Sequence, residues 1–492
     1  METQESSSKE LKLSTNIKDN MNYINSMFNN CPDIIRKKVI IADSKEGYFI
    51  YPKALINIDV LQRDFIKPIL AMSLEELYDD DLVNKLSLSE AGYRYELNTI
   101  VSEITDGNIV FIFDGSNKAI SYNLRTFESR PITEPVVEKN NRGPHEGFVE
   151  TLDINISILR RKIKNHRLKF RNMKVGAASN NQVAIGYIEG IANPKLIDDL
   201  YEKIISIDTD GLISLGPLEQ LMKDNQYSPF PLYIATERPD KVMAGLFEGQ
   251  LVILLDGSPV VLLAPVSFFA FFQALDDYTS NWLFGTFSRI MRLVAGVIAV
   301  FLPAIYIMIT SYHYYVVPLN LLIPLAESRA KVPFPPIVEA LLMEFTIEMI
   351  RESAVRLPTY IGGSVGIVGG LVIGQAAVQA QLVSSLFVII VAVTAIASYL
   401  IPSHDMGTAL RVIRFVLMIL AAGFGICGVT FFISLLFAHL VKMESLGQPY
   451  FQPMVPTKLK ELKDTIIRVP TIFLKQRPDI AKPLDRIRGK NK

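Results

Sequence analysis

The hydrophobic residues of this chain follow two patterns, which meet near residue 266. From Lys37 to Pro265, short β-rich runs alternate with amphipathic helical runs, as is typical of α/β folds. Beyond that point come long apolar runs with few charges, which suit a membrane. The strands predicted in the first part are Val39–Ala42, Ile109–Phe113, Val183–Tyr187, Leu232–Ala235 and Leu251–Leu255, and the helices are Asp59–Leu70, Pro194–Ile205 and Pro217–Lys223.

An internal repeat divides the first part in two. Gly107–Ser116 reads GNIVFIFDGS, and Gly249–Ser258 reads GQLVILLDGS. Each is an apolar strand, a D-G turn and a second apolar run, which is the pattern of a β-hairpin. A chance likeness of two hairpins is the alternative. We favour two related α/β subdomains, at about residues 35–130 and 175–265, preceded by a polar N-terminal extension over residues 1–34.

The region between the subdomains, residues 131–174, is predicted to be a linker followed by a basic helix. Ser129–Gly147 is rich in proline and asparagine, Thr151–Arg167 has a helical pattern, and Leu168–Val175 alternates like a strand. Basic side chains close the helix. They could contact anionic lipid beneath a membrane, or they could be a solvated helix end. The cluster consists of Arg160, Arg161, Lys162, Lys164 and Arg167.

Residues 266–441 are predicted to form an all-α membrane domain with about four spans. The aromatic-rich segment Val266–Arg289 fits an interfacial helix, and Leu293–Tyr312 fits a first span. The uncharged run Leu357–Ser403 would be ~70 Å long as one helix, over twice the ~30 Å hydrocarbon core, so it must double back. The remaining spans are expected near 360–377 and 383–401, and at about Phe415–Leu440.

Charge distribution sets the expected topology of this membrane domain. Arg289 and Arg292 place the start of the first span in the cytosol. Four spans return the C-terminus there, where residues 442–492 form a basic tail, as the positive-inside rule expects. Arg411 and Arg414 fall on the wrong side in this topology. The start of the chain is polar and lacks an apolar signal core, so the soluble part is expected in the cytosol.

Two features of the membrane part suggest roles for particular residues. Four glycines at four-residue spacing would form a smooth helix ridge for close packing, within one subunit or between subunits. Three glutamates at the same spacing share a face of the predicted helix 336–356, which is re-entrant or interfacial. An acidic stripe in a membrane domain favours cations if it lines a pore; alternatively, it is a solvated face partly neutralised by Arg351 and Arg356. The glycines are Gly362, Gly366, Gly370 and Gly374, and the candidate pore-lining residues are Glu344, Glu348 and Glu352.

Composition narrows the classes of function. Hydrophobic residues make up 49% of the 492, and this, with the uneven spread of charge, excludes an entirely soluble enzyme. With 50 basic and 50 acidic residues there is no case for nucleic-acid binding. Cys31 and Cys427 form no CxxC, and the five histidines are isolated. There is no HExxH, GxSxG or Walker A motif, so we expect no enzyme activity, catalytic residue, metal or cofactor.

Four stretches of the sequence point to a known family. They are RGPHEGFVETLDINISILRRKI (142–163), PLYIATERPDKVMAGLFEGQLVILLDGSPVVLLAPVSFF (231–269), VPFPPIVEALLMEFTIEMIRESAVRLP (332–358) and KLKELKDTIIRVP (458–470). With them, the chain resembles the A subunit of GerA-family spore germinant receptors along nearly its whole length. The resemblance implies a multi-pass protein of the inner membrane of the bacterial spore, with its N- and C-terminal regions in the cytosol.

The same resemblance implies partners and an activity. The partners are a transporter-like B subunit, which mainly senses nutrients, a lipoprotein C subunit, further copies of the chain and membrane lipid. The implied activity is that of a ring-shaped oligomer conducting monovalent cations early in germination. Two classes of function stay open. In the first class the chain is a channel, either a nutrient-gated receptor subunit or a related accessory protein acting after the receptors. In the second class it is a non-conducting scaffold for the receptor complex.

Overall fold

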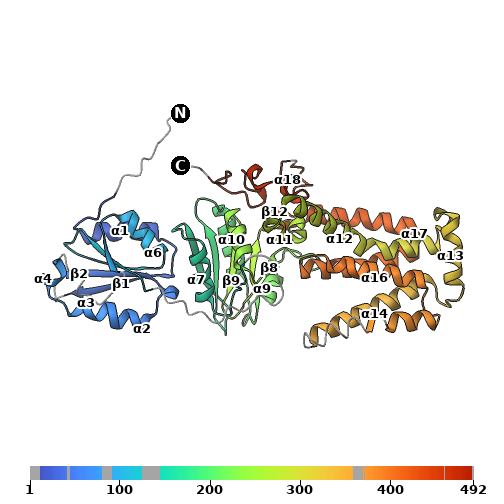
Figure 1. The fold of residues 1–492 in the computed structure, drawn as a ribbon, viewed down its shortest axis with the longest axis horizontal. Helices are drawn as coiled ribbons and strands as arrows, with labels where there is room; N and C mark the ends of the chain where they lie inside the picture. Colours follow the sequence, from blue (N-terminus) through green and yellow to red (C-terminus); the bar gives the residue numbers. More distant parts are fainter. Residues whose placement is uncertain are drawn as a thin grey trace. The chain divides into compact units, whose positions relative to one another are not determined.

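The computed structural model describes residues 11–41, 45–79, 91–124, 144–357, 369–370, 372–458 and 460–489. The chain divides into two compact units (Figure 1). The first unit contains the β-sheets and the helices that cover them, and comprises Met1–Gln226, Tyr233–Pro265 and Lys475–Lys492. The second unit is mainly helical and comprises Tyr227–Leu232 and Val266–Leu474.

Two five-stranded antiparallel sheets of the same topology make up the first unit. The order is β1-β2-β4-β5-β3 in one and β6-β7-β9-β10-β8 in the other. The two predicted D-G hairpins are β4–β5 and β9–β10, which occupy the same positions in the two sheets. The sequence repeat therefore corresponds to a repeated fold. The strands are β1 (Ile34–Ile41), β2 (Lys45–Pro52), β3 (Ala91–Arg94), β4 (Ile109–Phe113), β5 (Ala119–Tyr122), β6 (Leu168–Val175), β7 (Asn181–Ile188), β8 (Ile234–Thr236), β9 (Leu251–Leu255) and β10 (Val261–Ala264).

Helices cover both faces of the first sheet, which explains why its central strand β4 is apolar throughout. Phe111 and Phe113 point to one face, where they join a core with Phe65. Val110 and Ile112 point to the other, where they pack with residues of α1 and α6. The helices are α1 (Ile17–Met27), α2 (Ile58–Val60), a π-helical turn (Leu61–Ile66), α3 (Lys67–Ala71), α4 (Leu74–Tyr78) and α6 (Leu97–Thr105).

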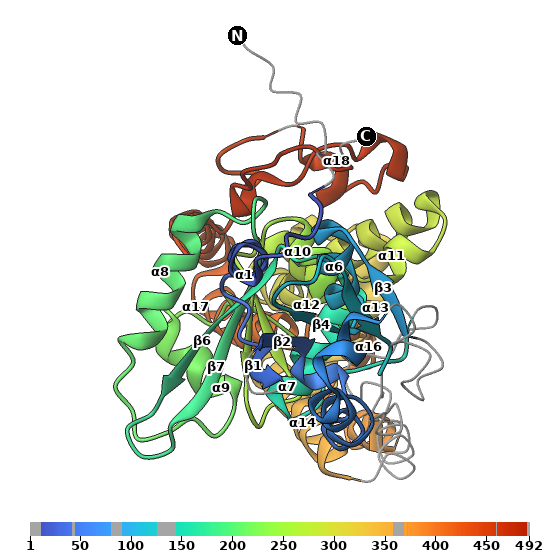
Figure 2. The same ribbon diagram turned by 90° about the vertical axis from the view of Figure 1, so that its left-hand side faces the viewer.

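The second sheet is also accompanied by helices. Helix α8 (Pro194–Ile205) packs near β6, beside the β6–β7 pair (Figure 2), and α10 (Pro239–Phe247) packs on β7 and β9. The predicted helices at Asp59–Leu70 and Pro194–Ile205 and the predicted strands at Ile109–Phe113 and Leu251–Leu255 are all present. The remaining helices of this half are α7 (Leu152–Lys162) and α9 (Leu215–Met222).

The structure differs from two predicted subdomain boundaries. Residues 1–34 are not simply a polar extension, because α1 places Ile17 and Ile24 in the core of the first subdomain. Likewise β6 pairs with β7 along its whole length, so the second sheet begins at Leu168 rather than 175. In both cases an amphipathic segment next to a polar stretch supplies part of the core. Most of the predicted linker lies outside the described residues.

The second unit contains two described helices that are long and apolar enough to cross a membrane, α12 (Trp282–Ser311) and α17 (His404–Lys442). A shorter apolar helix is α16 (Ser385–Tyr399). The predicted span near 360–377 lies largely outside the described residues; the chain is helical again at 372–379 and turns before α16. The other helices are α11 (Asp276–Thr279), α13 (Leu319–Ala330) and α14 (Pro336–Arg356).

The approach segment Val266–Arg289 is not one interfacial helix. A 3-10 turn (Phe268–Phe272) and α11 precede α12, whose first residues take up the rest of the segment. The chain turns here around the buried carboxylate of Asp277. This carboxylate accepts hydrogen bonds from Arg292 at 2.8 and 2.9 Å and forms an ion pair with Arg289 at 3.3 Å. These charges therefore compensate one another at the start of α12.

Helix α17 is two helices joined at Gly425, where φ is 57° and ψ is −134°. Before the junction it runs parallel to α12. Leu410 lies beside Gly296 near the start of α12, and Ala422 accepts a hydrogen bond of 2.6 Å from Tyr312 Oη, just past the end of α12.

After the junction the chain returns toward the start of α12. Phe272 lies against Gly296, and its ring contacts that of Phe268. The ring of Phe230 lies between those of Phe268 and His439, at 6.1 Å from each. Both ends of α17 thus lie near the same end of α12, so the helix reverses at Gly425. Only glycine adopts that backbone conformation without strain.

The predicted basic tail, residues 442–492, is folded where the structure describes it. It begins with the two-stranded β11 (Glu444–Ser445) and β12 (Gln448–Pro449) and buries Tyr450 and Phe451. Its last part belongs to the first unit, where Leu484 donates its backbone N–H to Ile191 O at 2.9 Å. Buried aromatic residues among the basic ones explain why this tail packs.

Candidate functional site

Helix α14, which holds the three predicted acidic residues, packs against α12, α16 and α17. Its inner face buries Glu339, Ala340, Met343 and Glu344. The helix begins with Pro336, where a missing N–H leaves no intrahelical bond unmade. Its 21 residues rise about 32 Å, close to the thickness of a bilayer core. The acids are therefore distributed along a helix of spanning length.

The first acid of the predicted stripe, Glu344, is in a buried ion pair. Arg414 Nη2 of α17 lies 2.9 Å from Glu344 Oε2, and the two side chains are 2% and 1% exposed. A charge removed from water in this way is tolerated only with a partner. Glu344 is therefore a packing residue between α14 and α17, and its carboxylate does not face a water-filled path.

The second acid, Glu348, is half-buried and shared between two arginines. Arg411 Nε of α17 lies 3.2 Å from Glu348 Oε1, and Arg351 Nη1 lies 3.6 Å from Oε2. Arg351 also donates to Ser398 Oγ at 2.8 Å and lies over the Tyr399 ring. The two arginines that did not suit the predicted topology, Arg411 and Arg414, are thus the partners of the acidic stripe.

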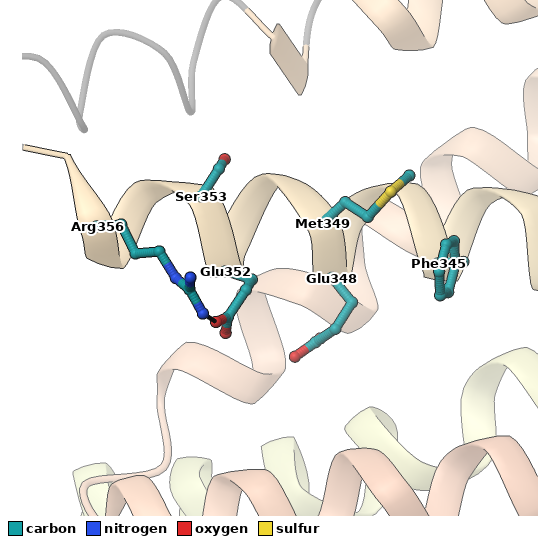
Figure 3. A pocket seen from close by; sticks show the side chains of 6 residues that line it. All are labelled: Phe345, Glu348, Met349, Glu352, Ser353 and Arg356. Atoms are coloured by element: carbon teal, nitrogen blue, oxygen red, sulfur yellow. Dashed lines mark hydrogen bonds and ion pairs between the residues drawn. The ribbon is translucent and has the colours of Figure 1, made fainter.

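The third acid, Glu352, is exposed. Its partner is Arg356, one helical turn on, at 2.6 Å, and the two side chains are 66% and 77% exposed. Such an exposed pair contributes little to stability. Figure 3 shows this pair and Glu348 on the same side of α14. Together with neighbouring side chains they line an open groove of about 520 Å³, whose residues are Phe345, Glu348, Met349, Glu352, Ser353 and Arg356.

A fourth acid, Glu339, was not singled out from the sequence. It is fully buried, and it accepts hydrogen bonds from the backbone N–H and the hydroxyl of Ser384. Arg329 lies 3.8 Å away, and Tyr306 is hydrogen-bonded to the same Ser384 hydroxyl at 3.0 Å. Glu339 precedes Glu344 by five residues and so falls outside the four-residue spacing. Its position in an otherwise apolar run was the available signal.

The outer face of α14 has a regular pattern of exposed side chains. Ser353 and Val355 are exposed as well. The six other exposed positions recur at alternating intervals of four and three residues, which is the heptad spacing of helices that pair side by side. The first four are apolar and the last two are the exposed ion pair. The positions are Val338, Leu342, Phe345, Met349, Glu352 and Arg356.

The glycine ridge is only partly described. Gly362 and Gly366 lie outside the described residues. Among described atoms, none lies within 4 Å of a Cβ built at Gly370, and at Gly374 only Val388 comes that near, at 3.7 Å. Gly374 is therefore buried against α16 within this chain, whereas no described atom packs against Gly370.

The basic cluster does not form one exposed surface. Arg160 is buried and makes two hydrogen bonds of 3.0 Å to Asp33, across the boundary of the two subdomains. This corrects the expectation that Arg160 contacts lipid: Asp33 compensates its charge. Arg161 pairs with Glu146, and Lys164 lies 3.1 Å from Asp106.

Burial changes the titration of this cluster, lowering the pKa values of Arg161 and Lys162. The Arg167 side chain is exposed and stays a candidate for lipid contact. As for metals, the described residues contain no group of three His, Cys, Asp or Glu side chains able to hold an ion.

Comparisons with known proteins match nearly the whole chain. The family model described as Bacillus/Clostridium GerA spore germination protein matches residues 22–480. Spore germination protein B1 of Bacillus subtilis is 35% identical over 483 residues, covering 97% of this chain and 100% of that protein. The uncharacterized membrane protein YfkQ of Bacillus subtilis is 36% identical over 468 residues, covering 95% of this chain and 91% of that protein.

Among solved structures, the chain is similar to the N-terminal domain of the A subunit of the Bacillus megaterium spore germinant receptor GerK3. The identity is 27% and the TM-score 0.40, covering 52% of this chain and 97% of that domain.

Proposed function

The chain belongs to the GerA family of spore germination proteins, and from that premise we propose that it is a receptor A subunit that forms a cation-conducting ring. In this proposal the ring opens when the receptor responds to a nutrient and releases monovalent cations early in germination. It lies in the inner membrane of the spore, with both terminal regions in the cytosol. Its partners are a transporter-like B subunit and a lipoprotein C subunit.

The graded exposure of the acids along α14 is the observation that supports this proposal most. Glu344 is buried in an ion pair with Arg414, Glu348 is half-buried, and Glu352 is exposed in the groove. Carboxylates repeated around an oligomer attract cations. We therefore assign the conducting role to Glu348 and Glu352, and remove Glu344 from the candidate pore-lining set.

The exposed heptad pattern on α14 supports assembly into a ring. An apolar stripe such as Leu342, Phe345 and Met349 suits packing against the same helix of the next copy. In a ring, Glu352 then forms a circle of carboxylates beside these apolar positions. Its surface pair with Arg356 is weak enough to exchange for a passing cation.

A scaffold without conduction is the second candidate, and one observation favours it. Each of the acids Glu339, Glu344, Glu348 and Glu352 lies within 4 Å of an arginine. An acidic face that is neutralised along its length can hold helices together without attracting ions. The two candidates differ in whether the exposed acids affect ion flux.

The test is monovalent-cation release from nutrient-triggered spores carrying Glu348→Gln and Glu352→Gln together. The matched control is Glu327→Gln, an exposed acid of α13 outside the groove. With membrane levels of the receptor equal to wild type, we expect slowed release in the double variant alone. Release at the wild-type rate would reject the conducting role of these acids and favour the scaffold.

A further inference from the structure

The chain beyond α12 forms an unusual exposed segment. No Asp, Glu, Lys or Arg occurs from Leu293 to Ala326, yet after Ser311 most side chains are exposed. We call the most exposed of them the distal apolar segment. Its residues are Tyr314, Tyr315, Val316, Leu319, Leu321 and Ile323, each more than half exposed.

This segment is held in place at both ends. Before it, Tyr312 donates to Ala422 O, and His313 Nε2 accepts the backbone N–H of Ile426 at 3.3 Å. These contacts join it to the reversal of α17. After it, Leu325 is buried and Ser328 is hydrogen-bonded to Ser385. The exposed apolar side chains therefore belong to a structured element of the second unit.

The length of α12 places the distal apolar segment at the end of a membrane span. Leu293–Ser311 follows Arg292 directly and rises about 28 Å, close to the ~30 Å hydrocarbon core. If Arg292 marks one boundary of the core, Ser311 reaches the other. The turn of α17 at Gly425 lies at the same level, since Tyr312 contacts it. The distal apolar segment then starts where the headgroup region begins.

The arrangement of its side chains distinguishes between possible occupants. Leu319 and Ile323, four residues apart, share one side of α13, and Leu321 between them points to the opposite side. A protein partner would cover one side of a helix, as at the heptad stripe of α14. Apolar exposure on several sides, beside tyrosines, is typical of the membrane interface.

We propose that the distal apolar segment docks in the headgroup region of the phospholipid leaflet at the end of α12 remote from Arg292. This rests on the membrane location in the proposed function, and it assigns a lipid-binding surface to residues 314–323. Tyr314 and Tyr315 place their rings at the level of the headgroups, next to the first carbons of the acyl chains, with their hydroxyls toward water. In this position α13 fixes the turn of α17 relative to the bilayer.

Single-tryptophan variants test the proposal, because Trp282 is the only native tryptophan. In a Trp282→Phe background, Tyr314→Trp and Leu321→Trp report on the segment. Phe431→Trp, exposed on the second half of α17, reports on the hydrocarbon core, and Ile213→Trp, exposed on the first unit, reports on water. The full chain is reconstituted in vesicles of phosphatidylglycerol and phosphatidylethanolamine with bromine atoms either near the headgroups or near the chain ends.

We expect both segment variants to lose more emission with the shallow bromines than with the deep ones, and Phe431→Trp to show the opposite order. Ile213→Trp should be quenched by aqueous iodide alone. Segment variants quenched by iodide alone would place the segment in water, and segment variants protected from every quencher would place it under protein; either result overturns the proposal. If Phe431→Trp is also insensitive to lipid, the membrane location itself fails.

Discussion

At the scale of single residues, the buried ion pairs give the clearest predictions for stability. Glu344 and Arg414 are both nearly inaccessible to water, so each is stable only in the presence of the other. Removing one partner leaves an uncompensated charge, whereas removing both leaves a neutral contact. This asymmetry separates a structural ion pair from an acid that faces a pore.

Arg414→Met alone should destabilise the protein by about 3–5 kcal/mol, because Glu344 stays buried without a partner. The double variant Arg414→Met with Glu344→Leu should recover much of that loss. Thermal unfolding in detergent measures both. A single variant as stable as the double variant would show that Glu344 is not held in the low-dielectric interior.

Two ion pairs across the subdomain boundary provide a matched comparison. Arg160 with Asp33 is buried, whereas Lys53 with Asp153 is about half exposed on each side. Arg160→Met should cost about 3–5 kcal/mol and Lys53→Met about 0–1 kcal/mol. Chemical denaturation of the full chain in detergent measures the difference, and equal losses would contradict the burial of Arg160.

His166 gives the first unit a pH dependence. Burial, aided by nearby Lys169 and Arg167, lowers its pKa from the usual 6.5. As the pH falls through that value, the unfolded chain binds the proton before the folded chain does, so the free energy of unfolding decreases until the folded pKa is passed. His166→Gln should flatten this dependence between about pH 7 and pH 5. Melting temperatures across this range measure it; a slope identical to wild type would contradict the assignment.

At the scale of elements, the local pattern of apolar and polar residues was enough to predict the regular strands and helices of the first unit. The run IVFIF (residues 109–113) and the helix Pro194–Ile205 appear with the predicted limits, because apolar strands and amphipathic helices have characteristic periods. The helix from Ile17 was missed because it follows a polar start. Its spacing of Ile17, Met21, Ile24 and Phe28 was the signal.

The acidic stripe shows what local pattern cannot supply. Its spacing placed Glu344 and Glu348 on one face of a helix, as observed, but the partners Arg411 and Arg414 come from α17. Long-range pairing of charges depends on which helices become neighbours. The reversal of α17 at Gly425 was also missed, since the glycines of this apolar run (Gly423, Gly425 and Gly428) give little change in hydropathy.

The glycine ridge gives a prediction at the same scale. Gly370 has open space around it within the described part of the chain, so Gly370→Leu should leave the fold of one subunit intact while blocking close packing between subunits. Val372→Leu, an exposed position two residues further on, is the control. Native gel electrophoresis of the membrane complex measures assembly. Normal assembly of Gly370→Leu would remove the ridge from the subunit interface.

At the scale of the whole molecule, the chain combines a duplicated sheet unit with a helical unit whose buried acids Asp277, Glu339 and Glu344 are paired with arginines. The C-terminal region contributes to both units, because residues 446–474 pack in the helical unit and the last described residues in the first. Conduction itself is the claim at this scale, and it depends on Glu348 and Glu352.

The most direct test of that claim is the reversal potential of the purified receptor complex in planar bilayers under a potassium chloride gradient. We expect nutrient-dependent currents that reverse near the potassium equilibrium potential, shifting toward zero in Glu348→Gln with Glu352→Gln and unchanged in Glu327→Gln. Cation-selective currents with the same reversal potential in all three complexes would contradict the role of α14. The absence of nutrient-dependent current from a complex that still triggers germination would contradict conduction altogether.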